Sequence, residues 1–171
     1  MPVSSGAAIL TDVSSTPSAL PPSGYRFSTE VRVRLPETDA FGIVFHGYFY
    51  TYFDVARMDY LRKLGLMDHI RPMGGLTNTI AHASADFRSP ARFDDELVVF
   101  ARISGFGRTS FTFEFAITNK ADGRLVAEGR TVHVILDEKS WRPTPVPESF
   151  RSAVRKFEGA GVKEKASPGR P

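Results

Sequence analysis

The chain of 171 residues contains no cysteine. This absence excludes disulfide bonds, cysteine-ligated zinc, iron–sulfur clusters and thiol nucleophiles. It also fits a reducing compartment, so we expect a cytoplasmic protein. No apolar run approaches the roughly 20 residues that a membrane-spanning helix needs, so we expect no membrane span. The length suits one domain better than two.

Most of the chain also lacks an excess of either charge. Lys and Arg number 22 against 19 Asp and Glu, and residues 25–150 hold 16 of each sign. The surplus lies in residues 151–171, where six basic residues outnumber two acidic ones. A nucleic-acid-binding domain normally carries its basic surface on its folded part. We therefore expect no nucleic-acid partner.

The two ends of the chain differ in composition from the middle. Residues 1–24 are dominated by Ser, Pro and small residues, and residues 159–171 by small and basic ones. Neither segment holds enough apolar surface to offset the entropy lost on ordering. The composition predicts a disordered extension over 1–24, one folded domain over 25–158 and a disordered basic tail over 159–171.

Hydrophobic periodicity predicts one long helix among strands. Residues 29–35 alternate as a half-buried strand, with Leu35 facing inward. Apolar residues then recur at steps of three and four from 47 to 64, and Gly65 supplies a stop signal. Further strands are expected at 77–87, 96–104, 109–119 and 125–136, with a short closing helix at 149–157.

This element order predicts an α+β fold. One strand and one helix are followed by four strands joined by hairpins, so we expect an antiparallel sheet of about five strands covering the long helix. The last long strand is apolar on both faces, which favours an interior position. A single sheet of this kind leaves edge strands exposed. Oligomerisation would cover them, so we expect at least a dimer.

The segment between the first strand and the long helix contains the strongest candidates for catalytic groups. Asp39 precedes a turn built on Gly42, and the helix begins near His46. A helix N-terminus presents unpaired N–H groups that could polarise an acyl carbonyl. A nearby carboxylate could attack that carbonyl or deprotonate water. An aspartate before a glycine turn is also a common turn former, and spacing alone favours this structural interpretation of Asp39.

Several motifs in order resemble one protein family. Residues 32–66 read RVRLPETDAFGIVFHGYFYTYFDVARMDYLRKLGL, with E-T-D-x-x-G-x-V-x-H before a helix that contains Y-F-[ED]-x-A-R. This stretch resembles the signature of the 4-hydroxybenzoyl-CoA thioesterase-like branch of the hotdog-fold acyl-CoA thioesterases. Residues 86–99, 107–117 and 123–137 resemble further stretches of the same family. The resemblance covers about residues 26–150 and implies a curved sheet wrapped around a central helix, the hotdog fold.

The resemblance implies an acyl-CoA thioesterase that uses no metal and no cofactor, because coenzyme A is part of its substrate. Asp39 occupies the position of the family's catalytic aspartate, a nucleophile or general base. The backbone N–H of His46 corresponds to the donor that polarises the thioester carbonyl. Gly42 permits the turn, and Gly47 lets the backbone approach the ligand. The resemblance also implies a homodimer or homotetramer with acyl-CoA pockets at its subunit interfaces.

Further residues are expected to bind the substrate. Arg108 matches a basic position near the coenzyme A phosphates in relatives, whereas Arg88 and Arg92 are weaker candidates that are equally well explained as solvated arginines. Val44 and Tyr48 are expected at the acyl pocket.

The chain also departs from the family pattern. Tyr48-Phe49 stands where many relatives have Asn-Tyr, which puts the acyl preference in doubt. Asp54 stands where glutamate is common. Other hotdog branches take their acid from the helix, so Asp54 and Asp59 are the fallback carboxylates.

Some alternatives stay open. The acyl group could be carried by an acyl-carrier protein in place of coenzyme A. The chain could be a non-catalytic hotdog protein that binds acyl-CoA or lipid. It could also be a hotdog hydratase or dehydratase, an enzyme that generally uses a histidine with an acid and forms an enoyl product.

Overall fold

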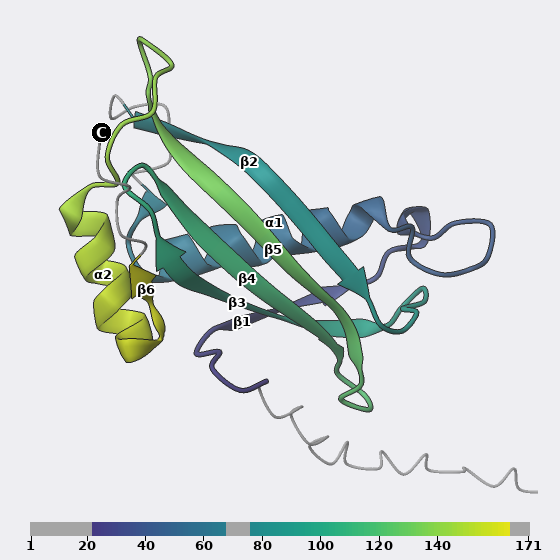
Figure 1. Ribbon diagram of the computed structural model, residues 1–171. Helices are drawn as coiled ribbons and strands as arrows, with labels where there is room; N and C mark the ends of the chain where they lie inside the picture. The colour runs from purple at the N-terminus through teal and green to yellow at the C-terminus, as the bar shows by residue number, and fades with distance from the viewer. Residues whose placement is uncertain (1–21, 68–75, 165–171) are drawn as a thin grey trace, which may run out of the picture.

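The computed structural model describes residues 22–67 and 76–164 of the chain (Figure 1). A mainly antiparallel sheet curves along one long helix, and a shorter helix packs at one end of the sheet. The elements in chain order are β1 (Ser28–Arg32), η1 (Leu35–Glu37), α1 (Gly47–Lys63), β2 (Leu76–Phe87), β3 (Glu96–Phe106), β4 (Ser110–Asn119), β5 (Leu125–Asp137), α2 (Glu148–Glu158), η3 (Gly159–Gly161) and β6 (Lys163–Glu164).

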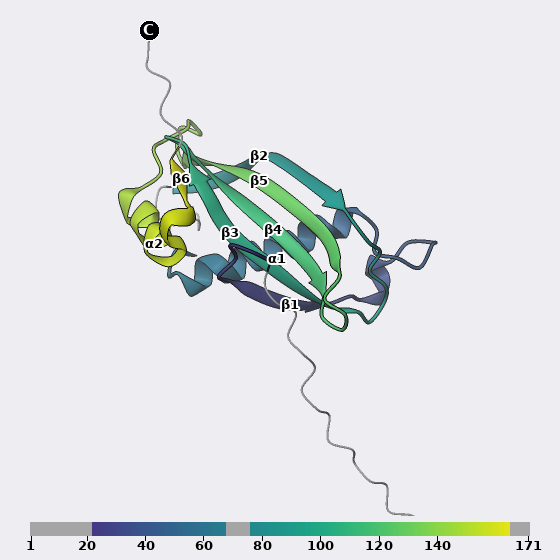
Figure 2. The same cartoon turned by 60° about the horizontal axis from the view of Figure 1, so that its bottom comes forward.

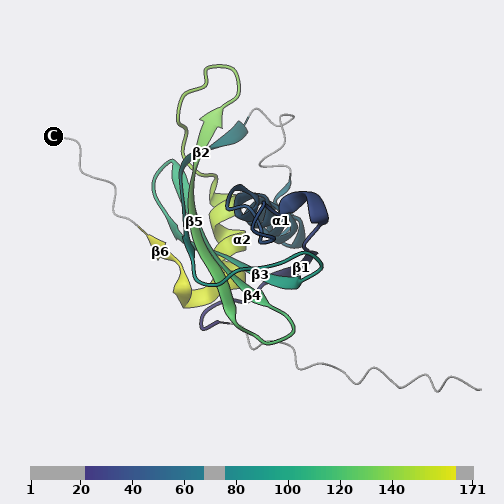
Figure 3. The same ribbon diagram turned by 90° about the vertical axis from the view of Figure 1, so that its right-hand side faces the viewer.

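The long helix forms where the sequence predicts it. Helix α1 spans Gly47–Lys63, and Gly65 follows in the left-handed conformation with φ of 70°. Its buried residues follow the predicted stripe, with two more beside it: Phe49, Tyr52, Phe53, Ala56, Tyr60 and Leu61. Figure 3 looks along the helix and shows that the sheet curves around it. The apolar stripe is therefore what seats α1 in the sheet.

Close packing of α1 on the sheet depends on a glycine in β5. The Phe53 ring stacks on the Phe115 ring of β4 with their centroids 4.7 Å apart. A Cβ atom at Gly129 would overlap the Phe53 ring. The missing side chain thus lets the helix approach the centre of the sheet.

The first strand is shorter than predicted. β1 ends at Arg32, and Leu35 is 64% exposed at the start of the 3-10 turn η1. Val33 is buried and still donates its N–H to the carbonyl oxygen of Asp95 at 2.9 Å. The prediction is wrong at Leu35 because Pro36, with its fixed φ, begins a helical turn and cannot continue the strand ladder.

The strand order is β1-β3-β4-β5-β2, and β6 pairs with β3. The expected hairpins join β3 to β4 and β4 to β5, and β5 lies inside the sheet as predicted. A hairpin between β2 and β3 is not formed, because β2 pairs with β5 at the opposite edge. Hydrophobic periodicity identifies which face of a strand is buried, but it does not identify which other strand pairs with it. The α+β hotdog architecture itself is confirmed.

The described chain continues beyond the expected domain boundary at residue 158. Helix α2 ends there as predicted, but η3 follows it and β6 pairs in parallel with β3 (Figure 2). The Glu164 carboxylate forms ion pairs with Arg151 at 2.9 Å and with Arg155 at 2.6 Å. The rest of the expected tail lies outside the described residues, as does nearly all of the expected N-terminal extension. Within the described ranges, no helix is both long and apolar enough to cross a membrane.

Candidate active site

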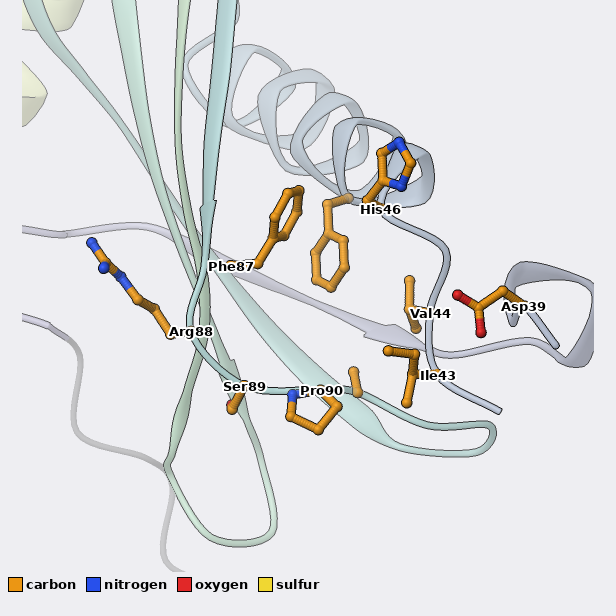
Figure 4. Close-up of a pocket in the computed structure, with 10 residues that line it drawn as sticks. Asp39, Ile43, Val44, His46, Phe87, Arg88, Ser89 and Pro90 are labelled. Carbon is orange, nitrogen blue, oxygen red and sulfur yellow. The ribbon is translucent and has the colours of Figure 1, made fainter. Parts of the chain in front are cut away.

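A cavity of about 550 Å³ lies between the start of α1 and the end of β2 (Figure 4). Its walls come from the loop before α1, from the first turn of α1 and from the segment that follows β2. The lining residues are Asp39, Ile43, Val44, His46, Phe49, Phe87, Arg88, Ser89, Pro90 and Ala91. A mostly apolar cavity with a few polar groups is typical of small-molecule sites.

Backbone hydrogen bonds hold the loop before α1 at both of its sides. Phe45 donates its N–H to the carbonyl oxygen of Glu37 at 2.9 Å, which closes the base of the loop. Val44 donates its N–H to the carbonyl oxygen of Ala91 at 2.8 Å, which joins the loop to the segment after β2. Two walls of the cavity are therefore fixed to each other by main-chain contacts.

Asp39 is both a turn former and a cavity residue. Its Oδ1 accepts the N–H of Phe41 at 2.8 Å, and its carbonyl oxygen accepts the N–H of Gly42 at 3.0 Å. Gly42 has a φ of 71°, as the predicted turn requires. Asp39 lines the cavity, and Figure 4 shows its carboxylate pointing toward Val44. The structural and chemical interpretations of Asp39 are compatible, because only Oδ1 is used in the turn.

Two amide groups at the start of α1 have no acceptor among the residues that the structure describes. Four of the six successive N–H groups in this segment donate to backbone carbonyl oxygens at 2.8–3.3 Å: those of Val44, Phe45, Tyr48 and Phe49. The two between them belong to His46 and Gly47, and no residue in the described part of the chain accepts a hydrogen bond from either. They can therefore donate to a ligand at the positive end of the helix dipole.

The side chain of His46 takes a different direction from its backbone. Figure 4 shows its ring pointing away from Asp39, Ile43 and Val44, and its centroid lies 6.4 Å from that of the Phe87 ring. The ring lies against that of Phe45 with 4.2 Å between their centroids. Only the main chain of His46 is thus suited to the role that the family resemblance implies.

Two of the predicted arginines lie near the cavity, but neither guanidinium faces into it. Arg88 lines the rim, and its Nη2 lies 3.0 Å from Oε2 of Glu128, pointing away in Figure 4. Arg92 is exposed in the turn before β3 and does not line the cavity. A substrate phosphate at Arg88 would have to compete with Glu128.

Arg108 lies at the far end of the sheet from the cavity. It precedes β4, whose Ser110 pairs with Val134 of β5. Val134 in turn pairs with Thr79 near the start of β2, whereas the cavity lies at Phe87, the end of that strand. Thr79 and Phe87 are eight residues apart along β2, which corresponds to about 26 Å. Arg108 therefore cannot reach the cavity of its own subunit.

The remaining predicted residues do not line the cavity. Gly47 is the first residue of α1, and Tyr48 packs half-buried against the core. The fallback carboxylates of α1 are engaged in ion pairs with neighbouring arginines at 2.5 Å: Asp54 with Arg57 and Asp59 with Arg62. Asp39 is thus the carboxylate that the fold brings to the cavity.

Sequence reasoning missed part of the site. Phe87 and Phe49 form an aromatic wall, with their ring centroids 5.2 Å apart. Phe87 is 50% exposed at the end of the edge strand β2, and such exposure is invisible in a sequence. Glu37 and Tyr52, buried behind the loop, were also missed. Among the described residues, no group of three or more His, Asp or Glu side chains is arranged to hold a metal ion.

Comparison with known proteins shows that this chain is similar in sequence to thioesterases. The profile of the Thioesterase-like superfamily matches residues 33–154. The chloroplastic acyl-acyl carrier protein thioesterase of Arabidopsis thaliana is 32% identical over 128 residues, which is 75% of this chain and 67% of that protein. The acyl-CoA thioester hydrolase YbgC of Escherichia coli O6:H1 is 28% identical over 124 residues, covering 72% and 92%.

A solved structure is also similar to this chain, and it too is a thioesterase. The 1,4-dihydroxy-2-naphthoyl-CoA thioesterase of Synechocystis superposes with a TM-score of 0.71 and 26% identity, covering 77% of this chain and 97% of that one. The profile match spans well over half of the chain and includes the loop, the helix and every strand from β2 to β5. This chain therefore belongs to the Thioesterase-like superfamily of hotdog proteins and is a thioester hydrolase.

Proposed function

We propose that this protein hydrolyses acyl-CoA thioesters to the free acid and coenzyme A at the cavity beside Asp39. The observation that carries the proposal is the meeting of three features in one cavity. These are a carboxylate with one oxygen outside the turn, the amide of the lining residue His46 with that of Gly47 next to it, neither having an acceptor among the described residues, and a mostly apolar wall. Acyl transfer needs a nucleophile or base, an oxyanion site and a place for the acyl group.

The reaction follows from these groups. The carbonyl oxygen of the thioester accepts hydrogen bonds from the amides of His46 and Gly47, which polarise it. Asp39 then either takes a proton from water, which attacks the carbonyl carbon, or attacks that carbon itself and forms a mixed anhydride that water hydrolyses. The C–S bond breaks and the thiolate leaves. Because a thiol has a pKa of about 8.5, a strong general acid is not needed.

The cavity walls favour an apolar acyl group. Ile43, Val44, Phe49, Phe87 and Pro90 present aliphatic and aromatic surface. A volume of about 550 Å³ is in the range of small-molecule pockets. Named relatives act on coenzyme A thioesters and on acyl-carrier protein thioesters, which supports both carriers as substrates to be compared.

A second subunit would complete the site. β2 is an edge strand of 12 residues without lysine or proline, and Ile80 on it is 50% exposed. Such an edge is normally covered. Antiparallel pairing of two β2 strands would place the start of one beside the end of the other. Arg108 of the partner subunit would then lie near this cavity, where a basic group suits the phosphates of coenzyme A.

The test is a free-thiol release assay on the purified chain. The panel contains short, medium, long and aromatic acyl-CoAs, and matched acyl-carrier protein thioesters. We expect turnover of acyl-CoA, with higher kcat/KM for apolar acyl groups than for polar ones of equal size. Tight binding without thiol release would identify a non-catalytic acyl-CoA-binding protein. With a 3-hydroxyacyl-CoA added to the panel, loss of water to an enoyl product without free thiol would identify a hotdog enzyme of the hydratase or dehydratase class.

A further inference from the structure

A buried carboxylate lies at the base of the Asp39 loop. Glu37 is 2% exposed. Its Oε2 accepts the hydroxyl of Tyr52 at 2.7 Å and the backbone N–H of Arg34 at 2.8 Å. Its Oε1 accepts two N–H groups of the Arg34 guanidinium, at 2.8 and 2.5 Å. Burial acts to raise the pKa of Glu37, but these hydrogen bonds outweigh it and lower the pKa.

This carboxylate connects the two halves of the proposed site. Glu37 is two residues before Asp39, and its carbonyl oxygen closes the base of the loop by accepting the N–H of Phe45. Tyr52 lies on α1, within two turns of the amides at the helix start. The hydrogen bond between the two side chains therefore joins the Asp39 loop directly to the helix that carries those amides.

Stability alone does not account for this arrangement. Removing an ionised carboxylate from water is expensive, and an apolar pair of similar size often packs at least as well. A charged hydrogen bond differs from an apolar contact in being directional, so it defines one distance and one angle. Tyr52 also packs its ring edge-on against Phe49, a cavity residue, with centroids 5.9 Å apart.

We propose that Glu37 and Tyr52 are positioning residues, which set the place of the Asp39 carboxylate relative to the amides of His46 and Gly47. The inference rests on the proposed function of these groups. Reacting atoms must meet at about 3–3.5 Å, and a shift of about 1 Å can lower a rate a hundredfold. Loss of the Tyr52 hydroxyl removes this side-chain link between the loop and the helix without changing any group that touches the substrate.

The chain contains a matched control on the same helix. Tyr60 is also buried on α1 and donates its hydroxyl to Oε1 of Glu158 at 2.7 Å. Glu158 is buried at the end of α2 and has no contact with the Asp39 loop. The Tyr52 and Tyr60 hydrogen bonds thus agree in donor and acceptor type, burial and length. They differ in what they connect, and only Glu37 also accepts an arginine guanidinium.

The experiment compares Tyr52→Phe with Tyr60→Phe on an acyl-CoA that the parent chain hydrolyses. We expect Tyr52→Phe to lower kcat about ten- to hundredfold with KM within about threefold. Tyr60→Phe should keep kcat within about twofold, although it also lowers the melting temperature. Equal kcat losses in both variants, or no loss in Tyr52→Phe, would overturn the inference.

A double variant separates positioning from general weakening. In an Asp39→Asn background no carboxylate remains to be placed, so adding Tyr52→Phe should lower the residual rate less than twofold. A full ten- to hundredfold further loss would contradict positioning. Parent-like activity in Asp39→Asn alone would instead refute the catalytic assignment of Asp39, which is a different failure.

Hydrogen exchange supplies a measurement that does not depend on turnover. Residues 38–46 should exchange their amide protons faster in Tyr52→Phe than in the parent, and at the parental rate in Tyr60→Phe. Unchanged exchange of this segment in Tyr52→Phe would overturn the inference whatever the substrate proves to be.

Discussion

At the scale of single residues, Asp39 shows how one side chain serves structure and chemistry together. Its Oδ1 is used by the N–H of Phe41, and its carboxylate borders the cavity. Sequence spacing presents the turn former and the catalyst as rivals, because both need an acid before a glycine. In the structure both roles are possible, because only Oδ1 of Asp39 accepts a hydrogen bond in the turn. A residue's role in a turn is therefore no argument against its role in a reaction.

Gly42 and Gly65 provide a test at this scale. Both have positive φ, of 71° and 70°, and a Cβ at either would meet nothing within 4 Å. Alanine should therefore cost each site about 1 kcal/mol of unfolding free energy, from backbone strain alone. Because Gly42 lies in the Asp39 turn, only Gly42→Ala should also lower kcat.

Chemical denaturation and thiol release, measured side by side, check this expectation. Gly65→Ala, at the end of α1, is the control for strain without displacement of the loop. If Gly42→Ala destabilises the chain but retains the parental kcat, the geometry of the turn has no part in the reaction.

At the scale of elements, prediction succeeded where a repeating pattern spans several turns. The stripe over residues 47–64 matches α1 to within one residue, because burial of that stripe is what holds the helix in place. Prediction failed at Leu35, where alternation continued by chance into a turn begun by Pro36. A strand ends where its partner strand stops pairing with it, and the sequence around that end does not show where the partner stops.

The packing of α1 on β5 yields an element-scale prediction. Gly129→Ala would drive a methyl group into the Phe53 ring and should destabilise the fold by about 1–3 kcal/mol. Combining it with Phe53→Leu should cost less than the sum of the two single changes, because the smaller side chain frees the space.

Thermal unfolding of the two single variants and the double variant measures the coupling. Gly161→Ala, where a Cβ meets nothing within 4 Å, is the control for a tolerated glycine change. Strict additivity would mean that Gly129 and Phe53 do not share the contact.

At the scale of the whole molecule, the sheet order explains why part of the site was not predictable. The cavity joins the loop before α1 to the segment after β2, although some 40 residues of sequence separate them. Periodicity identifies each element but not which edge β2 occupies. Phe87, Pro90 and Ala91 lie in the family-like stretch 86–99, but the sequence did not identify any of them as a cavity residue.

The open edge of β2 predicts an oligomer. Light scattering should give twice or four times the chain mass of 18.9 kDa. Ile80→Lys puts a charge on the exposed edge and should release subunits with a loss in kcat/KM, because Arg108 of the partner subunit would leave the cavity. Phe93→Lys, 55% exposed in the turn before β3, should change neither property. A monomeric parent, or an Ile80→Lys variant of unchanged mass, would exclude pairing through β2.

The central claim is that the Asp39 carboxylate acts on the thioester. Asp39→Asn keeps a side-chain oxygen for the N–H of Phe41, so the turn should survive. Asp122→Asn is the matched control, because Oδ1 of Asp122 accepts the N–H of Arg124 at 3.0 Å in the same i to i+2 arrangement, in the turn between β4 and β5.

The decisive measurement is the steady-state rate of thiol release by these two variants and the parent on one acyl-CoA. We predict that Asp39→Asn lowers kcat by about a hundredfold or more with an unchanged melting temperature, because it removes the base or nucleophile. Asp122→Asn should match the parent. Equal kcat in all three proteins would contradict the account.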